Sequence, residues 1–83
     1  MKDLTPVSPI QTKYVGRKYR EAKGYTVREL ARKTYIAPST ITKWENQHTV
    51  PNLDCLVIVA RALEVEPSML YEIEETDIFL SRR

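Results

Sequence analysis

Side chains suited to hydrogen bonding with a nucleic acid recur at helical spacing between residues 38 and 46. Ser39, Thr42, Lys43 and Asn46 would share the outer face of one short helix, with Pro38 adding an apolar surface at its start. A lysine can donate to guanine O6 and N7 or neutralise a phosphate, and a threonine methyl can meet a thymine methyl. The alternative is that these side chains are simply solvated.

Residues 26–51 (TVRELARKTYIAPSTITKWENQHTVP) predict a pair of helices that would hold this face in place. Thr26 and Glu29 fit a capping box, so a helix begins there. Residues 35–37 would form a tight corner, and Pro38 suits the first position of the next helix because no N–H is needed there. The side chains expected to face inward are Leu30, Ala31, Ile41 and Trp44. Two amphipathic helices joined in this way outline a helix-turn-helix, whose second helix enters the DNA major groove.

Three further helices are predicted around this pair. One runs over about residues 11–23, with Gly16 weakening it by about 1 kcal/mol and Gly24 ending it. Asn52 caps another helix, and Pro67 opens a short last one. Apolar residues expected to face the core from these helices are Val15, Tyr19, Ala22, Leu53, Leu56, Ala60, Leu63, Met69, Leu70 and Ile73.

The expected fold is therefore all-α, a compact five-helix domain. It would occupy residues 11–73, after an N-terminal arm at 1–10 and before a C-terminal tail at 74–83. The net charge is +2, but residues 1–50 carry ten Lys/Arg against four acids and residues 51–83 carry three against seven. A polyanion would prefer the first half, which contains the helix pair, although solvated helix faces also explain these charges.

Composition argues against several other classes of protein. No apolar run is long enough to span a membrane, and residues 1–10 do not resemble a secretory signal. Cys55 is the only cysteine and His48 the only histidine, so neither an internal disulfide nor a zinc cluster is expected. We expect no cofactor, no metal and no enzymatic site, and we expect a bacterial or phage-encoded protein that lies in the cytoplasm on the nucleoid.

Anchor residues along the chain resemble the lambda-repressor-like (Cro/cI, or XRE) helix-turn-helix family over about residues 15–71. Several such anchors at the family's spacings make a more specific signal than a lone helix-turn-helix pattern. The matching residues are Tyr19-Arg20, Gly24, Thr26, Glu29-Leu30-Ala31, Ile36, Ser39-Thr40-Ile41, Trp44-Glu45-Asn46, Pro51, Ala60, Leu63, Val65 and Met69-Leu70.

The resemblance implies a dimer on a two-fold DNA operator, with residues 38–46 as the helix in the major groove. Positions that touch base edges in the family correspond to Pro38, Ser39, Thr42 and Lys43. Positions that touch phosphate correspond to Thr26, Val27, Thr40 and Asn46, to which Arg28 and His48 add further candidate contacts. The family's ion pair between the first and third helices corresponds to Arg20 and Glu45.

Four positions depart from the family's pattern, and one of them is Pro38, which offers only an apolar surface at a base-reading position. Tyr35 stands where glycine usually makes the corner, which predicts a slightly different turn because tyrosine disfavours a left-handed backbone. Ala37 replaces the usual Ser/Thr cap, a loss of about 1 kcal/mol. Gln47 replaces the glycine that usually ends the third helix. These departures put the contacts to the first bases in question.

Apolar residues outside the expected core predict a dimer interface. Residues 57–59 make their helix apolar nearly all round, which points to Ile58 as a contact. The full set of expected interface residues is Ile58, Val65, Pro67, Tyr71, Ile78, Phe79 and Leu80. Two-fold symmetry would place the two groove-binding helices about 34 Å apart. The alternative is that Ile58 is an isolated exposed residue.

These patterns favour a sequence-specific, double-stranded DNA-binding transcriptional regulator, a repressor acting as a homodimer on a palindromic operator. Two alternatives stay open. One is an antitoxin that binds DNA through the same helices and a toxin protein through residues of the tail or of the helix after Asn52. The other is a protein-interaction module that has lost DNA binding and uses the acidic segment 64–77.

Overall fold

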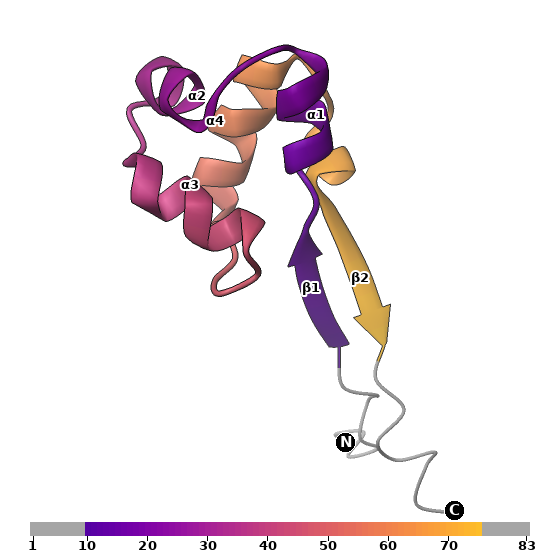
Figure 1. The fold of residues 1–83 in the computed structure, drawn as a ribbon. Coiled ribbons are helices and arrows are strands. Elements are labelled where there is room, and N and C mark those ends of the chain that lie inside the picture. The colour runs from indigo at the N-terminus through magenta and orange to yellow at the C-terminus, as the bar shows by residue number, and fades with distance from the viewer. Residues whose placement is uncertain (1–9, 76–83) are drawn as a thin grey trace, which may run out of the picture.

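The computed structural model describes residues 10–75, and Figure 1 shows a bundle of helices from which two strands project. The elements in chain order are β1 (Ile10–Tyr14), α1 (Arg17–Ala22), α2 (Val27–Thr34), α3 (Pro38–Glu45), α4 (Leu53–Leu63), the 3-10 helix η1 (Pro67–Leu70) and β2 (Tyr71–Glu75). We call residues 16–70 the helical body and the strands the β ribbon. In the described residues, no helix is long and apolar enough to cross a membrane.

The core of the helical body is built from the inner faces of α2, α3 and α4. Leu30, Ile41, Val59, Leu63 and Leu70 have no more than 1% of their surface exposed. The predicted inward positions of Ala31, Trp44, Leu56 and Ala60 are confirmed. Four predictions were wrong, since Ala22, Leu53, Met69 and Ile73 are exposed. Ala22 is the last residue of α1 and Leu53 the first of α4, where the helical stripe runs beyond the neighbouring elements.

Local signals define the helix starts as the sequence predicts. The Thr26 hydroxyl accepts a hydrogen bond from the Glu29 N–H, and the Glu29 carboxylate accepts one from the Thr26 N–H, which completes the capping box. The Asn52 side chain accepts from the Cys55 N–H at the start of α4. Pro67 occupies the first turn of η1. Each of these hydrogen bonds joins residues three positions apart, so a short stretch of sequence is enough to predict it.

The expectation of an all-α fold was wrong, because two strands flank the helices. β1 and β2 pair antiparallel, with Tyr14 opposite Tyr71 and Ile10 opposite Glu75. The first predicted helix, 11–23, is therefore a strand followed by the six-residue α1. The predicted last helix is the four-residue η1, and Ile73 lies on β2 rather than on a helix. The predicted boundaries at residues 10 and 74 both fall within these strands.

Tyr14 inserts the base of the β ribbon into the core. Its ring is buried and lies 5.6 Å from the Trp44 ring, centroid to centroid. Gly16 precedes α1 instead of weakening it, and a Cβ there would collide with the Tyr14 phenol. A glycine at this position therefore makes room for the tyrosine. The predicted loss of helix stability at Gly16 does not arise.

Candidate nucleic-acid interface

The outer face of α3 carries the predicted base-contacting residues in positions open to solvent. Pro38, Ser39, Thr42 and Lys43 are exposed, whereas Ile41 and Trp44 on the opposite face are buried. The resulting surface combines one ammonium, two hydroxyls and an apolar ring. The one acid of α3, Glu45, points inward to Arg20, so no carboxylate of this helix opposes a polyanion.

A buried ion pair fixes α3 against α1. Arg20 Nε donates to Glu45 Oε2 at 2.7 Å and Arg20 Nη2 donates to Glu45 Oε1 at 3.0 Å. Arg20 Nη1 donates to the Tyr25 carbonyl at 2.7 Å, and the two charged side chains are only 11% and 6% exposed. The hydrogen bonds to Glu45 raise the pKa of Arg20 above its usual value. A bidentate arginine–carboxylate pair of this kind fixes orientation as well as distance.

The end of α3 is held by contacts to the β ribbon and the following loop. Gln47 Nε2 donates to the Tyr14 carbonyl at 2.9 Å, and the His48 N–H donates to the Lys43 carbonyl at 2.8 Å. Gln47 adopts the left-handed backbone (φ 65°) that the family's glycine would supply. Asn46 and His48 are exposed beside the end of α3. The role of Gln47 was not predicted, since nothing local in the sequence reveals its contact with Tyr14.

The residues at the start of α2 that are predicted to contact phosphate differ in which of their polar groups are available. Thr26 is exposed, but its N–H is bonded to Glu29, so only its hydroxyl hydrogen can be given to a phosphate. Val27 is half-buried against the core, which leaves its backbone N–H as its polar group. Arg28 is exposed. The Thr26 backbone N–H lowers the pKa of Glu29, so this carboxylate is ionised at neutral pH beside the same helix start. Thr40, on α3, is half-buried.

The corner between α2 and α3 keeps the left-handed conformation. Tyr35 has φ 58° and ψ 30°, so the prediction of a different turn was wrong. Its side chain is 98% exposed, so no packing contact opposes this backbone conformation, which is strained for a residue other than glycine. Ala37 caps α3 without a side-chain hydrogen bond, as its type dictates.

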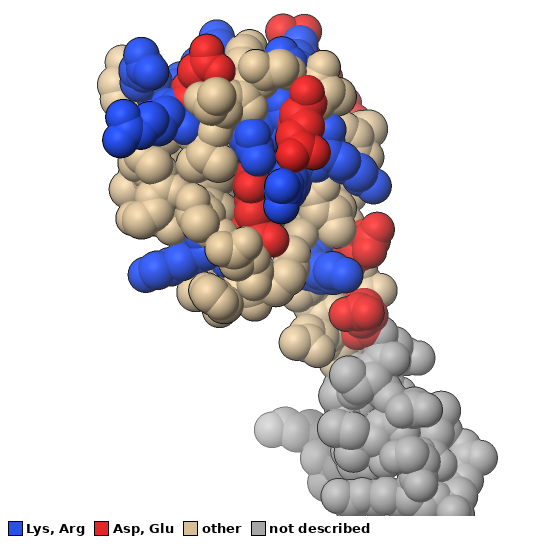
Figure 2. Space-filling model, in the orientation of Figure 1, with Lys and Arg blue, Asp and Glu red and all other residues tan. Residues whose placement is uncertain are grey.

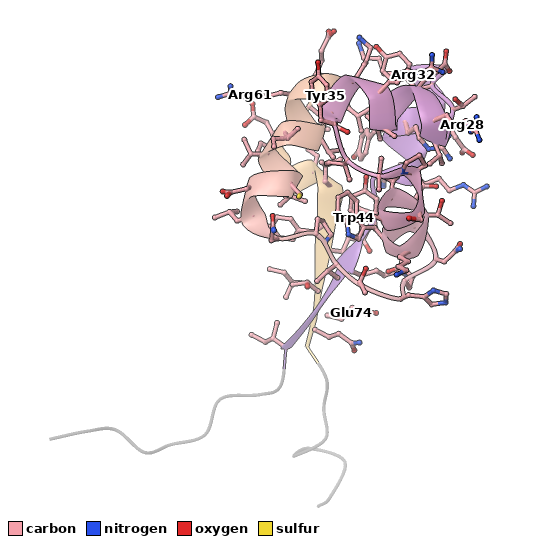
Figure 3. All side chains as sticks on the ribbon, turned by 90° about the vertical axis from the view of Figure 1, so that its left-hand side faces the viewer. Arg28, Arg32, Tyr35, Trp44, Arg61 and Glu74 are labelled. Atoms are coloured by element: carbon pink, nitrogen blue, oxygen red, sulfur yellow. The ribbon has the colours of Figure 1, made fainter. Side chains whose placement is uncertain are left out.

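Two arginines and the corner tyrosine surround a cleft between α2 and α3. The cleft measures about 470 Å³, and its lining includes Arg28, Arg32, Tyr35 and Pro38 but no acid. Figure 2 shows Lys and Arg side chains gathered around the upper left of the body, where α2 lies in Figure 1, and Figure 3 labels Arg28 and Arg32 on this part of the molecule. Arg32 and Tyr35 were not among the predicted contacts. Their place beside Pro38 adds them to the candidate surface.

The predicted dimer residues do not form one exposed apolar patch in the described part of the chain. Ile58 is 43% exposed and shares a shallow cleft with Lys33 and Arg61. Val65, Pro67 and Tyr71 are half-buried. Ile78, Phe79 and Leu80 lie outside the described residues.

Among residues 10–74, no group of three His, Cys, Asp or Glu side chains could hold a metal ion.

Comparison with known proteins assigns the class. A family model described as helix-turn-helix matches residues 17–70, more than half of the chain, so the protein belongs to the lambda-repressor-like (XRE) helix-turn-helix family. Among solved structures, it is similar to a proposed DNA-binding protein from Bacteroides fragilis, with 31% sequence identity and a TM-score of 0.70. That similarity covers 75% of this chain and 100% of the other. The search of curated proteins found no match.

Proposed function

We propose that this DNA-binding regulator is a transcriptional repressor that binds a palindromic operator as a homodimer, with α3 in the major groove. Family membership and the similar structure support DNA binding. Occupying an operator excludes other proteins from that stretch of DNA, and a repressor of this kind needs no contact with polymerase. The proposed role is one of binding and not of catalysis.

The observation that carries the proposal is that the C-terminal end of α3 is fixed by two separate contacts while the outer face of the helix stays open. The Arg20–Glu45 pair attaches it to α1, and Gln47 attaches the residues that follow it to Tyr14. A helix held in this way can present short side chains such as Ser39 to base edges at a constant distance. Short polar side chains can read bases only where the backbone approaches closely and does not move.

We assign roles to the exposed residues by their chemistry. Lys43 would donate to a guanine, Thr42 and Pro38 would touch thymine methyls, and Ser39 would hydrogen-bond a base edge. Contacts to phosphate set the register of the protein on the duplex, and they would supply most of the affinity. The residues proposed for phosphate contact are Thr26, Val27, Arg28, Thr40, Asn46 and His48, together with Arg32 and Tyr35 from the cleft.

The role of Lys43 can be tested by titrating a fluorescent duplex carrying the preferred sequence and one carrying a scrambled sequence. Lys43→Ala should weaken binding to the preferred duplex by roughly 1–3 kcal/mol and binding to the scrambled duplex by less. Lys23→Ala is the matched control, because Lys23 pairs with Glu64 (3.1 Å) at the end of α4. Equal weakening on both duplexes would make Lys43 a phosphate contact, and no weakening would show that Lys43 contacts neither bases nor phosphate.

A second candidate function is that of an antitoxin, which would hold a toxin protein as well as DNA. The observation that favours it is the exposed apolar side chains of the β ribbon, Ile10 and Ile73. Expression with the neighbouring genes of the source genome, followed by purification, tests it. A small protein that remains bound at high salt would support the antitoxin, and its absence would leave the regulator.

A further inference from the structure

The β ribbon exposes apolar side chains that its own chain does not cover in the described residues. Alternation along the strands puts Ile10, Thr12 and Tyr14 on the same face as Tyr71 and Ile73. Tyr14 enters the core, but Ile10 is 61% exposed and Ile73 is 62% exposed. Figure 1 shows the ribbon extending away from the helices. A two-stranded ribbon is only marginally stable in water, so this geometry favours a partner.

The outer edge of β1 offers backbone groups to such a partner. The Val15 N–H donates to the Leu70 carbonyl at 2.8 Å, which fixes the phase of the ladder. Because antiparallel pairs alternate, the N–H and C=O groups of Ile10, Thr12 and Tyr14 point away from β2. The Tyr14 carbonyl already accepts from Gln47. The strand therefore presents an edge that is free at Ile10 and Thr12, and at Tyr14 one lone pair of the carbonyl oxygen remains open.

Charge selects β1, and not β2, as the edge at which a second copy could pair. If two β1 strands pair antiparallel about Thr12, Gln11 of one copy lies opposite Lys13 of the other, and no like charges face each other. If two β2 strands pair about Ile73, Glu72 lies opposite Glu74 twice. Like charges directly opposite each other destabilise a sheet. The ribbon is thus self-complementary along β1 and self-repelling along β2.

A groove at the base of the β ribbon would receive the tip of the second copy. It measures about 210 Å³, and its lining includes Tyr14, Val50 and Leu53. Val50 is 50% exposed and Leu53 is 73% exposed. Pairing about Thr12 places Ile10 of the second copy opposite Tyr14, beside these two side chains. An open cleft of about 550 Å³ between residues 10–13 and the loop 47–50 gives the incoming strand room.

We propose that two copies of this chain join through their β1 strands, antiparallel about Thr12, with Ile10 of each copy seated beside Val50 and Leu53 of the other. This interface deepens the dimeric-regulator proposal, on which its biological meaning rests. It also explains why the β ribbon is attached to α3. Tyr14 packs on Trp44 and accepts from Gln47, so the pairing of the strands fixes how the two α3 helices are placed.

Thr12 lies on the proposed two-fold axis, which allows a charge-swap test on the full chain. Thr12→Lys alone and Thr12→Glu alone each place like charges opposite each other and should weaken self-association at least about tenfold. An equimolar mixture of the two variants places Lys opposite Glu and should restore the dimer. Sedimentation velocity across the micromolar range measures all three samples, and circular dichroism checks that the helices persist.

Ile58→Lys is the matched control, because it adds the same charge at the alternative interface on α4. Dimers that persist in Ile58→Lys, and that are lost and then restored in the Thr12 series, would establish the β1 interface. Dimers lost only in Ile58→Lys would overturn it in favour of α4. A wild-type chain that stays monomeric would also overturn it, and would assign the apolar face to the chain's own tail or to a foreign protein.

The same measurements separate this interface from the proposed function. Wild-type protein that selects a palindromic DNA sequence but does not respond to the Thr12 substitutions retains the function and rejects the interface. Self-association that depends on Thr12, without selection of any DNA sequence, retains the interface and rejects the operator-binding role.

Discussion

The helical body and the β ribbon differ in how far their apolar side chains are buried. In the body, the inner faces of α2, α3 and α4 bury Leu30, Ile41 and Val59 completely, and the Arg20–Glu45 charge pair is buried with matched partners. In the ribbon, Ile10 and Ile73 are more than half exposed, and one strand edge is open. The body therefore holds α3 through its buried ion pair, with a further contact from Tyr14 of the ribbon, whereas in the dimer that we propose the ribbon is completed by another chain. In this proposal, one domain recognises DNA through the body and a partner through the ribbon.

The largest expected effect comes from removing a charge from the body. Arg20→Ala should lower the free energy of unfolding by about 3–5 kcal/mol, because Glu45 would remain buried without its partner. Lys13→Ala in the ribbon should lower it by less than about 1 kcal/mol, since Lys13 is exposed. Urea unfolding measures both variants.

Arg17→Ala is the control for the arginine side chain itself. Arg17 pairs with Glu21 in the same helix at 3.1 Å, but these side chains are 62% and 54% exposed. We expect this variant to behave like Lys13→Ala. A loss as large as that of Arg20→Ala would show that burial of the Arg20–Glu45 pair is not what matters.

The second effect concerns Tyr14, where the β ribbon enters the body. Burial, then the nearby Glu45 charge, raise the pKa of Tyr14 from 10.0 to about 12. The protonated phenol is therefore favoured in the folded state, so its contribution is complete below pH 10 and is lost as the pH rises through about 12. A difference of this size corresponds to roughly 2–3 kcal/mol.

Tyr14→Phe isolates this titration from those of the other tyrosines and the lysines. The Tyr14 hydroxyl has no hydrogen-bond partner among the described residues, so its removal should not destabilise the protein at neutral pH. Unfolding measured between neutral and strongly alkaline pH should show a steeper fall for the wild type than for the variant. Parallel curves would mean that water reaches the phenol and that the ribbon is not anchored through it.

The smallest effect is at the corner between α2 and α3. Tyr35→Gly should raise the free energy of unfolding by about 1 kcal/mol, because glycine adopts the left-handed backbone without strain and the exposed side chain loses no packing. Gly24→Ala is the reciprocal control. Gly24 has φ 77° and open space around its Cα, so alanine there should lower stability by a similar amount. Thermal unfolding of both variants gives the comparison, and a destabilised Tyr35→Gly would indicate that the tyrosine makes contacts.

Features that depend on neighbouring residues could be predicted from the sequence. The Thr26–Glu29 capping box and the Asn52 cap each involve only residues within a stretch of four. The position of Pro38 at the start of α3 follows in the same way from its missing N–H. Helical spacing also placed Leu30, Ile41 and Trp44 in the core.

Features that depend on distant pairing were missed. The alternation of Ile10, Thr12 and Tyr14 with polar residues is a strand signal, but its partner lies at the other end of the described chain. A short alternating stretch before a helix can be read as its first turns, and the strand is decided only by the pairing with residues 71–75. The bond from Gln47 to Tyr14 belongs to the same class, because the side chain acts across the fold. The predicted dimer interface therefore included Ile58 on α4 and Tyr71 at the base of β2, but neither Ile10 nor Ile73 of the β ribbon.

The most direct test is to select random double-stranded DNA with the purified wild-type protein and to sequence what is bound. We expect an enriched palindrome whose half-sites lie about one helical turn, roughly 34 Å, apart. We also expect Lys43→Ala to relax the preference at one position of each half-site. Binding without any enriched sequence, weak and lost as salt is raised, would contradict the claim that α3 reads an operator.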